Sequence, residues 1–134
     1  MTASNIKSVQ EILSPVFGKH SDKVAFAYLF GSAAKEKMLP LSDVDIAVYF
    51  SHVRRELFTD SRLSLYADFC RALKRNDIDL IVLNTATNII ILDEIVRQGK
   101  VLYDRDPNLR EEFELLILHQ AIDFREQRLA VLGI

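Results

Sequence analysis

Apolar runs alternate along the chain with segments in which apolar residues recur every three or four positions. The runs at residues 24–30, 44–50 and 78–83 are rich in β-branched and aromatic residues and are flanked by polar ones. Such runs predict buried β-strands, because a strand covered on both faces needs no regular polar alternation. Residues 101–103 predict a shorter strand at the edge of the sheet.

The segments between the runs have the periodicity of amphipathic helices. Helices are predicted at about residues 5–17, 60–75, 88–98 and 107–130. On the second of these, the predicted inward side holds Leu63, Tyr66, Phe69, Cys70 and Leu73. A short helix at residues 32–37 and a loop at residues 38–42 are expected to join the first two strands. Strands that alternate with helices predict a mixed α/β sheet flanked by helices, and 134 residues suit a single domain over 1–134.

The last helix has an unusually wide apolar arc. One stripe consists of Leu109, Phe113, Leu116, Ile117, Ala121 and Phe124. Further apolar residues lie beyond it: Leu115, Leu118, Ile122 and Leu129. An arc this wide exceeds what one face of a sheet normally covers. Two interpretations stay open: the helix packs entirely in its own core, or part of it binds another protein chain.

Composition and charge narrow the function classes. Seventeen basic and nineteen acidic residues leave a net charge of −2, without the basic excess that general nucleic-acid binding requires. A single cysteine, Cys70, excludes an internal disulfide and fits a cytoplasmic location. Three scattered histidines argue against a zinc site. No apolar run approaches the length of a membrane span, and the first residues do not resemble a signal peptide.

The candidate chemistry lies where the predicted strands meet polar residues. Gly31 and Ser32 follow the first strand at a strand-to-helix turn, which could offer backbone N–H groups and a hydroxyl to phosphate. Asp43 and Asp45 are two positions apart at the start of the second strand, so their side chains are expected on one face. Two adjacent carboxylates favour a bound cation such as Mg²⁺.

A third carboxylate is expected from the next strand. Asp79 lies near the start of that strand, which is expected to neighbour the second one. Asp77 is its rival, although a place in a turn favours solvent exposure for that residue. Each feature also has a purely structural interpretation without any function. A Gly-Ser pair is often only a turn, and Asp43 could simply be a polar loop residue ahead of a strand. Both features and the third acid border core strands, where a carboxylate incurs a desolvation cost. Acidic residues are not expected there without a task, so the combination favours one functional site.

The Gly31-Ser32 pair, ten intervening residues and then Asp43-Val44-Asp45 resemble the signature of the DNA polymerase beta-like nucleotidyltransferase superfamily. The resemblance covers Val24 to the Gly99–Tyr103 segment. The chain is short and lacks a helical substrate domain, so it resembles the minimal nucleotidyltransferase (MNT) antitoxins that are paired with HEPN ribonuclease toxins.

That resemblance implies transfer of AMP from ATP to a tyrosine hydroxyl of a HEPN toxin, with two Mg²⁺ ions. Asp43, Asp45 and Asp79 are then the metal ligands and catalytic residues, and Gly31 and Ser32 bind the nucleotide phosphates. A hetero-oligomer with the toxin is expected, with a homodimer as a further possibility and no direct role for nucleic acid or membrane. Alternative functions are a binding-only antitoxin with a vestigial site, and nucleotidyl transfer to a small molecule.

One position departs from the pattern of the family. Relatives often carry a second glycine where this chain has Glu36. A carboxylate near the phosphates would weaken nucleotide binding unless it points to solvent, and Lys35 and Lys37 could offset its charge.

Overall fold

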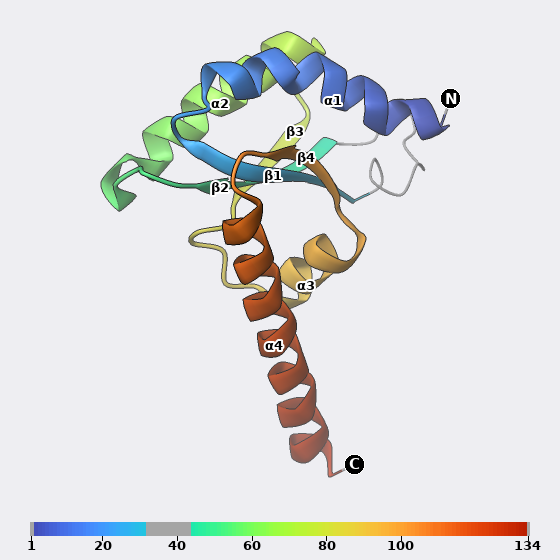
Figure 1. Ribbon diagram of the computed structural model, residues 1–134. Coiled ribbons are helices and arrows are strands. Elements are labelled where there is room, and N and C mark those ends of the chain that lie inside the picture. Colours follow the sequence, from blue (N-terminus) through green and yellow to red (C-terminus); the bar gives the residue numbers. More distant parts are fainter. Residues whose placement is uncertain (1, 32–43, 134) are drawn as a thin grey trace.

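A four-stranded sheet with strand order β3-β2-β1-β4 forms the centre of the protein (Figure 1). This computed structural model describes residues 2–31 and 44–133, with side chains from residue 7 onward. The strands are β1 (Val24–Phe30), β2 (Val44–Phe50), β3 (Ile78–Val82) and β4 (Lys100–Asp104). β1 is antiparallel to both β2 and β4, whereas β2 and β3 are parallel. The predicted mixed sheet is thus confirmed, and β3 neighbours β2 as expected.

Helices cover both faces of this sheet, as Figure 1 shows. One face is covered by α1 (Thr2–Lys19) and α2 (Phe58–Leu73), the second of which follows a short 3₁₀ helix, η1 (Arg55–Leu57). The other face packs against α3 (Ile89–Gln98) and α4 (Pro107–Leu132). This arrangement confirms the prediction of an α/β fold with a mixed sheet flanked by helices.

The predicted boundaries agree closely with the observed ones for the first two strands, and β4 is longer than expected at Lys100–Asp104. The predicted inward side of the second helix was partly wrong. Leu63 is 53% exposed, whereas Leu65 and Phe69 are fully buried. The predicted residues Tyr66, Cys70 and Leu73 are partly buried and pack against the core, so Leu63 is the one residue of the predicted stripe that does not face it. The helix predicted at 32–37 and the loop at 38–42 lie outside the described residues.

Two hydrophobic clusters form the core, one on each face of the sheet. Alternate residues of β2 belong to different clusters. Ile46 and Val48 face α1 and α2, whereas Ala47 faces α3 and α4. All residues of β1 are buried because this central strand is covered on both faces. Because side chains alternate along a strand, the odd-numbered residues of β2, including Asp45, face α3 and α4.

A buried polar cluster ties α1 to α2. The Asp68 side chain, 8% exposed, contacts His20 Nε2 at 2.7 Å and Lys19 Nζ at 3.1 Å, and it also accepts a hydrogen bond from Arg71. The hydrogen bond from His20 is the largest cause that holds the pKa of Asp68 far below its ordinary value, despite the opposing effect of burial. The packing of the two helices therefore depends on an ionised carboxylate.

The last helix extends away from the sheet (Figure 1). Only Phe113, Ile117 and Ala121 of α4 are buried, and every described residue after Phe124 is exposed. Its first turn is well anchored, since the Asp106 side chain caps the backbone N–H of Leu109. None of the helices formed by residues 2–31 and 44–133 is long and apolar enough to cross a membrane.

Candidate nucleotide site

The glycine that ends β1 lies directly beside a carboxylate of the neighbouring strand. Gly31 has φ +72°, a left-handed conformation that side chains other than hydrogen disfavour. A Cβ at this position would collide with Oδ2 of Asp45. The turn after β1 therefore has both a conformational and a steric requirement for glycine.

Two of the predicted carboxylates are brought together by the parallel ladder. Asp45 of β2 and Asp79 of β3 are direct register partners, as are the pairs on either side of them. Register partners in adjacent strands project to the same face of a sheet, so both carboxylates share one face. Asp45 is half-buried and Asp79 is exposed. Cations can therefore approach this pair from solvent.

The shared face is the one covered by α3 and α4. Asp45 is two residues before Ala47, which packs in the cluster formed with those helices. On its other side, Asp45 is the register partner of Phe30, the last residue of β1. The carboxylates thus sit at the end of the sheet where β1 finishes and where β2 and β3 begin.

The rival carboxylate Asp77 has a different partner. Its Oδ1 accepts a hydrogen bond of 2.6 Å from Arg75 Nε, and its Oδ2 accepts one of 2.7 Å from Arg75 Nη2. These bonds lower the pKa of Asp77. Because the bidentate pair occupies both oxygens, Asp79 is the better candidate for a metal ligand on β3.

Gly31, Asp45 and Asp79 are the sequence-predicted site residues that the structure brings together. Ser32 and Asp43 lie outside the described residues, so their proposed roles stay predictions. Within 2–31 and 44–133, no group of three or more histidine, cysteine, aspartate or glutamate residues could hold a metal ion. The two aspartates nevertheless suit Mg²⁺, which prefers hard carboxylate oxygens and usually binds one or two of them together with substrate phosphates.

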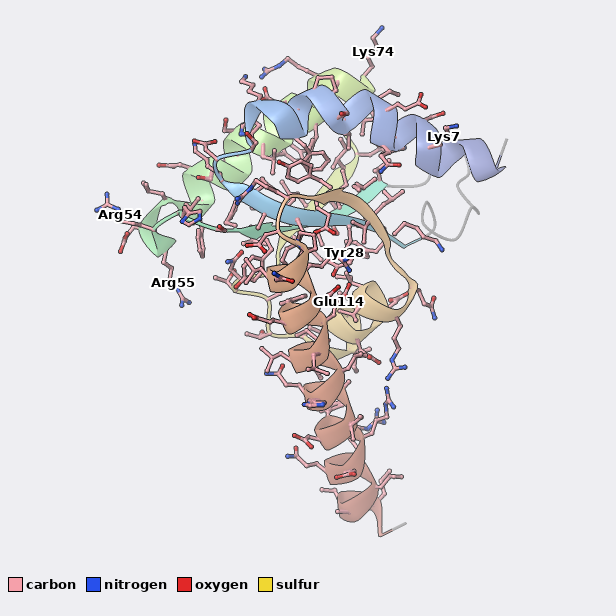
Figure 2. All side chains as sticks on the ribbon, viewed as in Figure 1. Lys7, Tyr28, Arg54, Arg55, Lys74 and Glu114 are labelled. Carbon is pink, nitrogen blue, oxygen red and sulfur yellow. The ribbon has the colours of Figure 1, made fainter. Side chains whose placement is uncertain are left out.

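Sequence reasoning missed a buried polar group on the same face of the sheet. The Tyr28 hydroxyl donates a hydrogen bond of 2.6 Å to Glu114 on α4, and Figure 2 shows the two residues between the sheet and that helix. Arg110 binds both Glu114, at 3.2 Å, and Asp104, at 2.9 Å. Burial, followed by the bond to Glu114, raises the pKa of Tyr28 far above its usual range. Only the four-residue spacing of Arg110 and Glu114 signalled this cluster in the sequence.

The fold and the paired carboxylates are those of a nucleotidyltransferase domain. The sequence model of the family described as Polymerase beta, Nucleotidyltransferase matches residues 11–108, and the chain belongs to this family. No curated protein sequence matches the chain.

Several solved structures share the fold over nearly the whole chain. A chain of a toxin–antitoxin complex with AMP-PNP has a TM-score of 0.74 and 24% identity, over 92% of this chain and 95% of that one. A chain of the complex between a tri-AMPylated Shewanella oneidensis HEPN toxin and its MNT antitoxin has a TM-score of 0.63 and 24% identity, over 99% and 97%. A chain of a mutant MntA toxin–antitoxin complex gives a TM-score of 0.69 and 25% identity, over 90% and 92%.

Proposed function

We propose that this protein is an antitoxin that transfers AMP from ATP to a tyrosine hydroxyl of a cognate HEPN ribonuclease toxin. The observation that carries the proposal is the register pairing of Asp45 with Asp79 beside the glycine turn at Gly31. A nucleotidyltransferase needs carboxylates for metal ions next to a phosphate-binding turn, and these residues supply both. The similar toxin–antitoxin structures, one with AMP-PNP and one with an AMPylated toxin, support the choice of nucleotide and acceptor.

Three carboxylates are assigned to the two Mg²⁺ ions in this proposal. Asp45 and Asp79 face the same side of the sheet, and Asp43 is the third ligand. When bound, the Mg²⁺ ions stabilise negative charge on the phosphates and on the attacking oxygen. A cation would suit this position because two carboxylates on adjacent strands repel each other, and a bound positive charge would offset that repulsion.

The remaining residues of the site bind the nucleotide and handle a proton. Backbone N–H groups at Gly31 and the hydroxyl of Ser32 hold the β- and γ-phosphates. The tyrosine oxygen forms a bond to the α-phosphorus while the bond to the β-phosphate oxygen breaks, and diphosphate leaves. Asp79, the more exposed carboxylate, accepts the tyrosine proton and passes it to solvent.

Label transfer tests this function directly. The purified protein is incubated with Mg²⁺, α-³²P-labelled ATP and the HEPN protein encoded beside it, and the wild type is expected to label the toxin. An Asp43→Asn, Asp45→Asn double variant should leave the toxin unlabelled. Labelling that persists in the double variant would refute the assignment of these carboxylates.

The same variants separate catalysis from a binding-only antitoxin. If contact alone neutralised the toxin, the double variant would protect RNA from cleavage as well as the wild type does. We expect instead that RNA cleavage resumes when the double variant replaces the wild type and ATP is present. Replacing the acceptor tyrosine of the toxin by phenylalanine should abolish labelling by the wild type.

A further inference from the structure

The side of α4 that points away from the sheet has a distinct composition, and we call it the outer face. Its apolar residues are Leu115, Ile122 and Leu129, which are 57%, 45% and 47% exposed. Leu116 does not belong to it, because that residue lines a pocket with Tyr49 of β2. Its charged residues are Glu111, Glu112, Asp123 and Glu126, all exposed. The outer face is therefore both apolar and acidic.

The outer face is separate from the face that holds α4 on the domain. Phe113, Ile117 and Ala121 point toward the sheet and α3 and are buried. Leu115, Ile122 and Leu129 follow one another at intervals of seven residues on the opposite side. A seven-residue interval is typical of a helix that packs along another helix. The sheet uses one stripe of α4, and a second stripe is left for a helical partner.

The arginines of α4 do not offset the acids of the outer face. Arg110 binds Asp104 and Glu114 beside the sheet, at 2.9 and 3.2 Å. Arg125 binds Asp93 of α3 at 3.2 Å. Arg128 lies over the ring of Phe124, 5.8 Å from its centroid. Arg110 and Arg125 are thus paired with acids beside the domain, and the arginines border the outer face only near Leu129, where Arg125 and Arg128 line a groove with it. The outer face keeps its negative charge around Leu115 and Ile122.

This charge distribution discriminates between two occupants. A second copy of the chain on the outer face would place Glu and Asp side chains against their own equivalents, which is unfavourable. A partner with lysine or arginine around an apolar surface would instead be complementary. Under the proposed antitoxin function, the HEPN toxin is the candidate for such a partner.

We propose that the outer face of α4 is the docking surface for a helix of the HEPN toxin that is bordered by lysine and arginine. The proposal rests on the proposed antitoxin function. The outer face points away from the sheet, so a partner docked there leaves open the end of the sheet with Gly31, Asp45 and Asp79. The partner can therefore be held while its tyrosine reaches the nucleotide.

Two pairs of matched variants test the surface. Ile122→Ala and Glu126→Lys alter the outer face, and Ile12→Ala and Glu11→Lys make the same changes on α1. Ile12 and Ile122 are equally exposed, at 44% and 45%. Binding of the neighbour-encoded HEPN protein is measured by calorimetry, with circular dichroism to verify folding.

The outer-face variants are each expected to weaken toxin binding by about tenfold or more, as buried anchors of interfaces do. The α1 variants should bind like the wild type. Higher salt should weaken wild-type binding more than that of Glu126→Lys. Wild-type affinity in both outer-face variants would overturn the proposal, as would a homodimer in sedimentation that Ile122→Ala dissociates.

Further variants distinguish a failure of the docking proposal from a failure of the AMP-transfer proposal. An Asp45→Asn variant should bind the toxin with wild-type affinity although it transfers no AMP. Ile122→Ala should recover AMP transfer at saturating toxin, because it affects docking only. A wild type that binds through α4 without labelling the toxin would refute AMP transfer and leave the docking surface intact.

Discussion

Asp45 on β2 and Asp79 on β3 are register partners in a parallel ladder and share one face of the sheet. Neither strand alone could have specified this pairing, since the two aspartates are 34 positions apart in the chain. The paired carboxylates favour a bound cation at this site.

Mg²⁺ should stabilise the wild-type fold. Binding to the folded state alone raises the free energy of unfolding by mass action, so Tm should rise by a few degrees in millimolar Mg²⁺. Asp45→Asn should lose this rise, because a neutral amide is a weaker ligand for Mg²⁺ than a carboxylate. Thermal unfolding followed by circular dichroism, with and without Mg²⁺, measures the effect. An equal rise in the variant would contradict metal binding by Asp45.

Loss of either carboxylate should also slow AMP transfer. A metal-bound transition state gains several kcal/mol from its ligands, so Asp45→Asn and Asp79→Asn should each reduce the rate by at least about 100-fold. Asp77→Asn is the matched control, because Asp77 binds Arg75. A larger loss in Asp77→Asn than in Asp79→Asn would reverse the assignment of the ligand on β3.

Gly31→Ala should impair both stability and nucleotide binding. The left-handed conformation costs an alanine about 1–2 kcal/mol, and its methyl group would strike the Asp45 carboxylate. Gly18→Ala provides the contrast, because Gly18 lies in α1 with open space around its Cα. It should stabilise the protein by up to about 1 kcal/mol. Urea unfolding measures the difference, and a neutral Gly31→Ala would refute the close approach of Asp45.

Asp68 should make stability depend on acid pH. Its pKa is lowered in the folded state, so its contribution is present above about pH 4, the pKa of an unfolded aspartate, and is lost as the pH falls toward the folded value. Asp68→Asn should cost about 2 kcal/mol at neutral pH. The difference from the wild type should shrink below about pH 4. Urea titrations across pH test this, with Asp123→Asn on the exposed part of α4 as the control.

The Tyr28 hydroxyl should contribute to the attachment of α4. Tyr28→Phe is expected to cost about 1 kcal/mol, because its bond to Glu114 is lost while Glu114 keeps Arg110. The raised pKa predicts that Tyr28 stays a neutral donor at alkaline pH until the protein unfolds. A double-mutant cycle with Glu114→Gln isolates the pair. Zero coupling in that cycle would contradict the bond.

Most of the secondary structure could be predicted from the sequence. The bounds of β1 and β2 follow from apolar runs, and Pro107 marks the first turn of α4. Local signals of this kind depend on a few consecutive residues, so the sequence pattern is sufficient to predict them. The same reading misjudged Leu63 on α2, because the direction of a helix face depends on what packs against it.

The sequence by itself determined the order of the elements and the residue types that make nucleotidyl transfer chemically feasible, including Gly31, Asp45 and Asp79. Tertiary structure alone decided that Asp45 and Asp79 share one face of the sheet, that Arg75 engages Asp77, and that Asp68 and Glu114 bind partners on other elements. The physical reason is that most of these relations join residues distant in the chain. Their geometry is set by sheet register and helix packing, which no local pattern encodes.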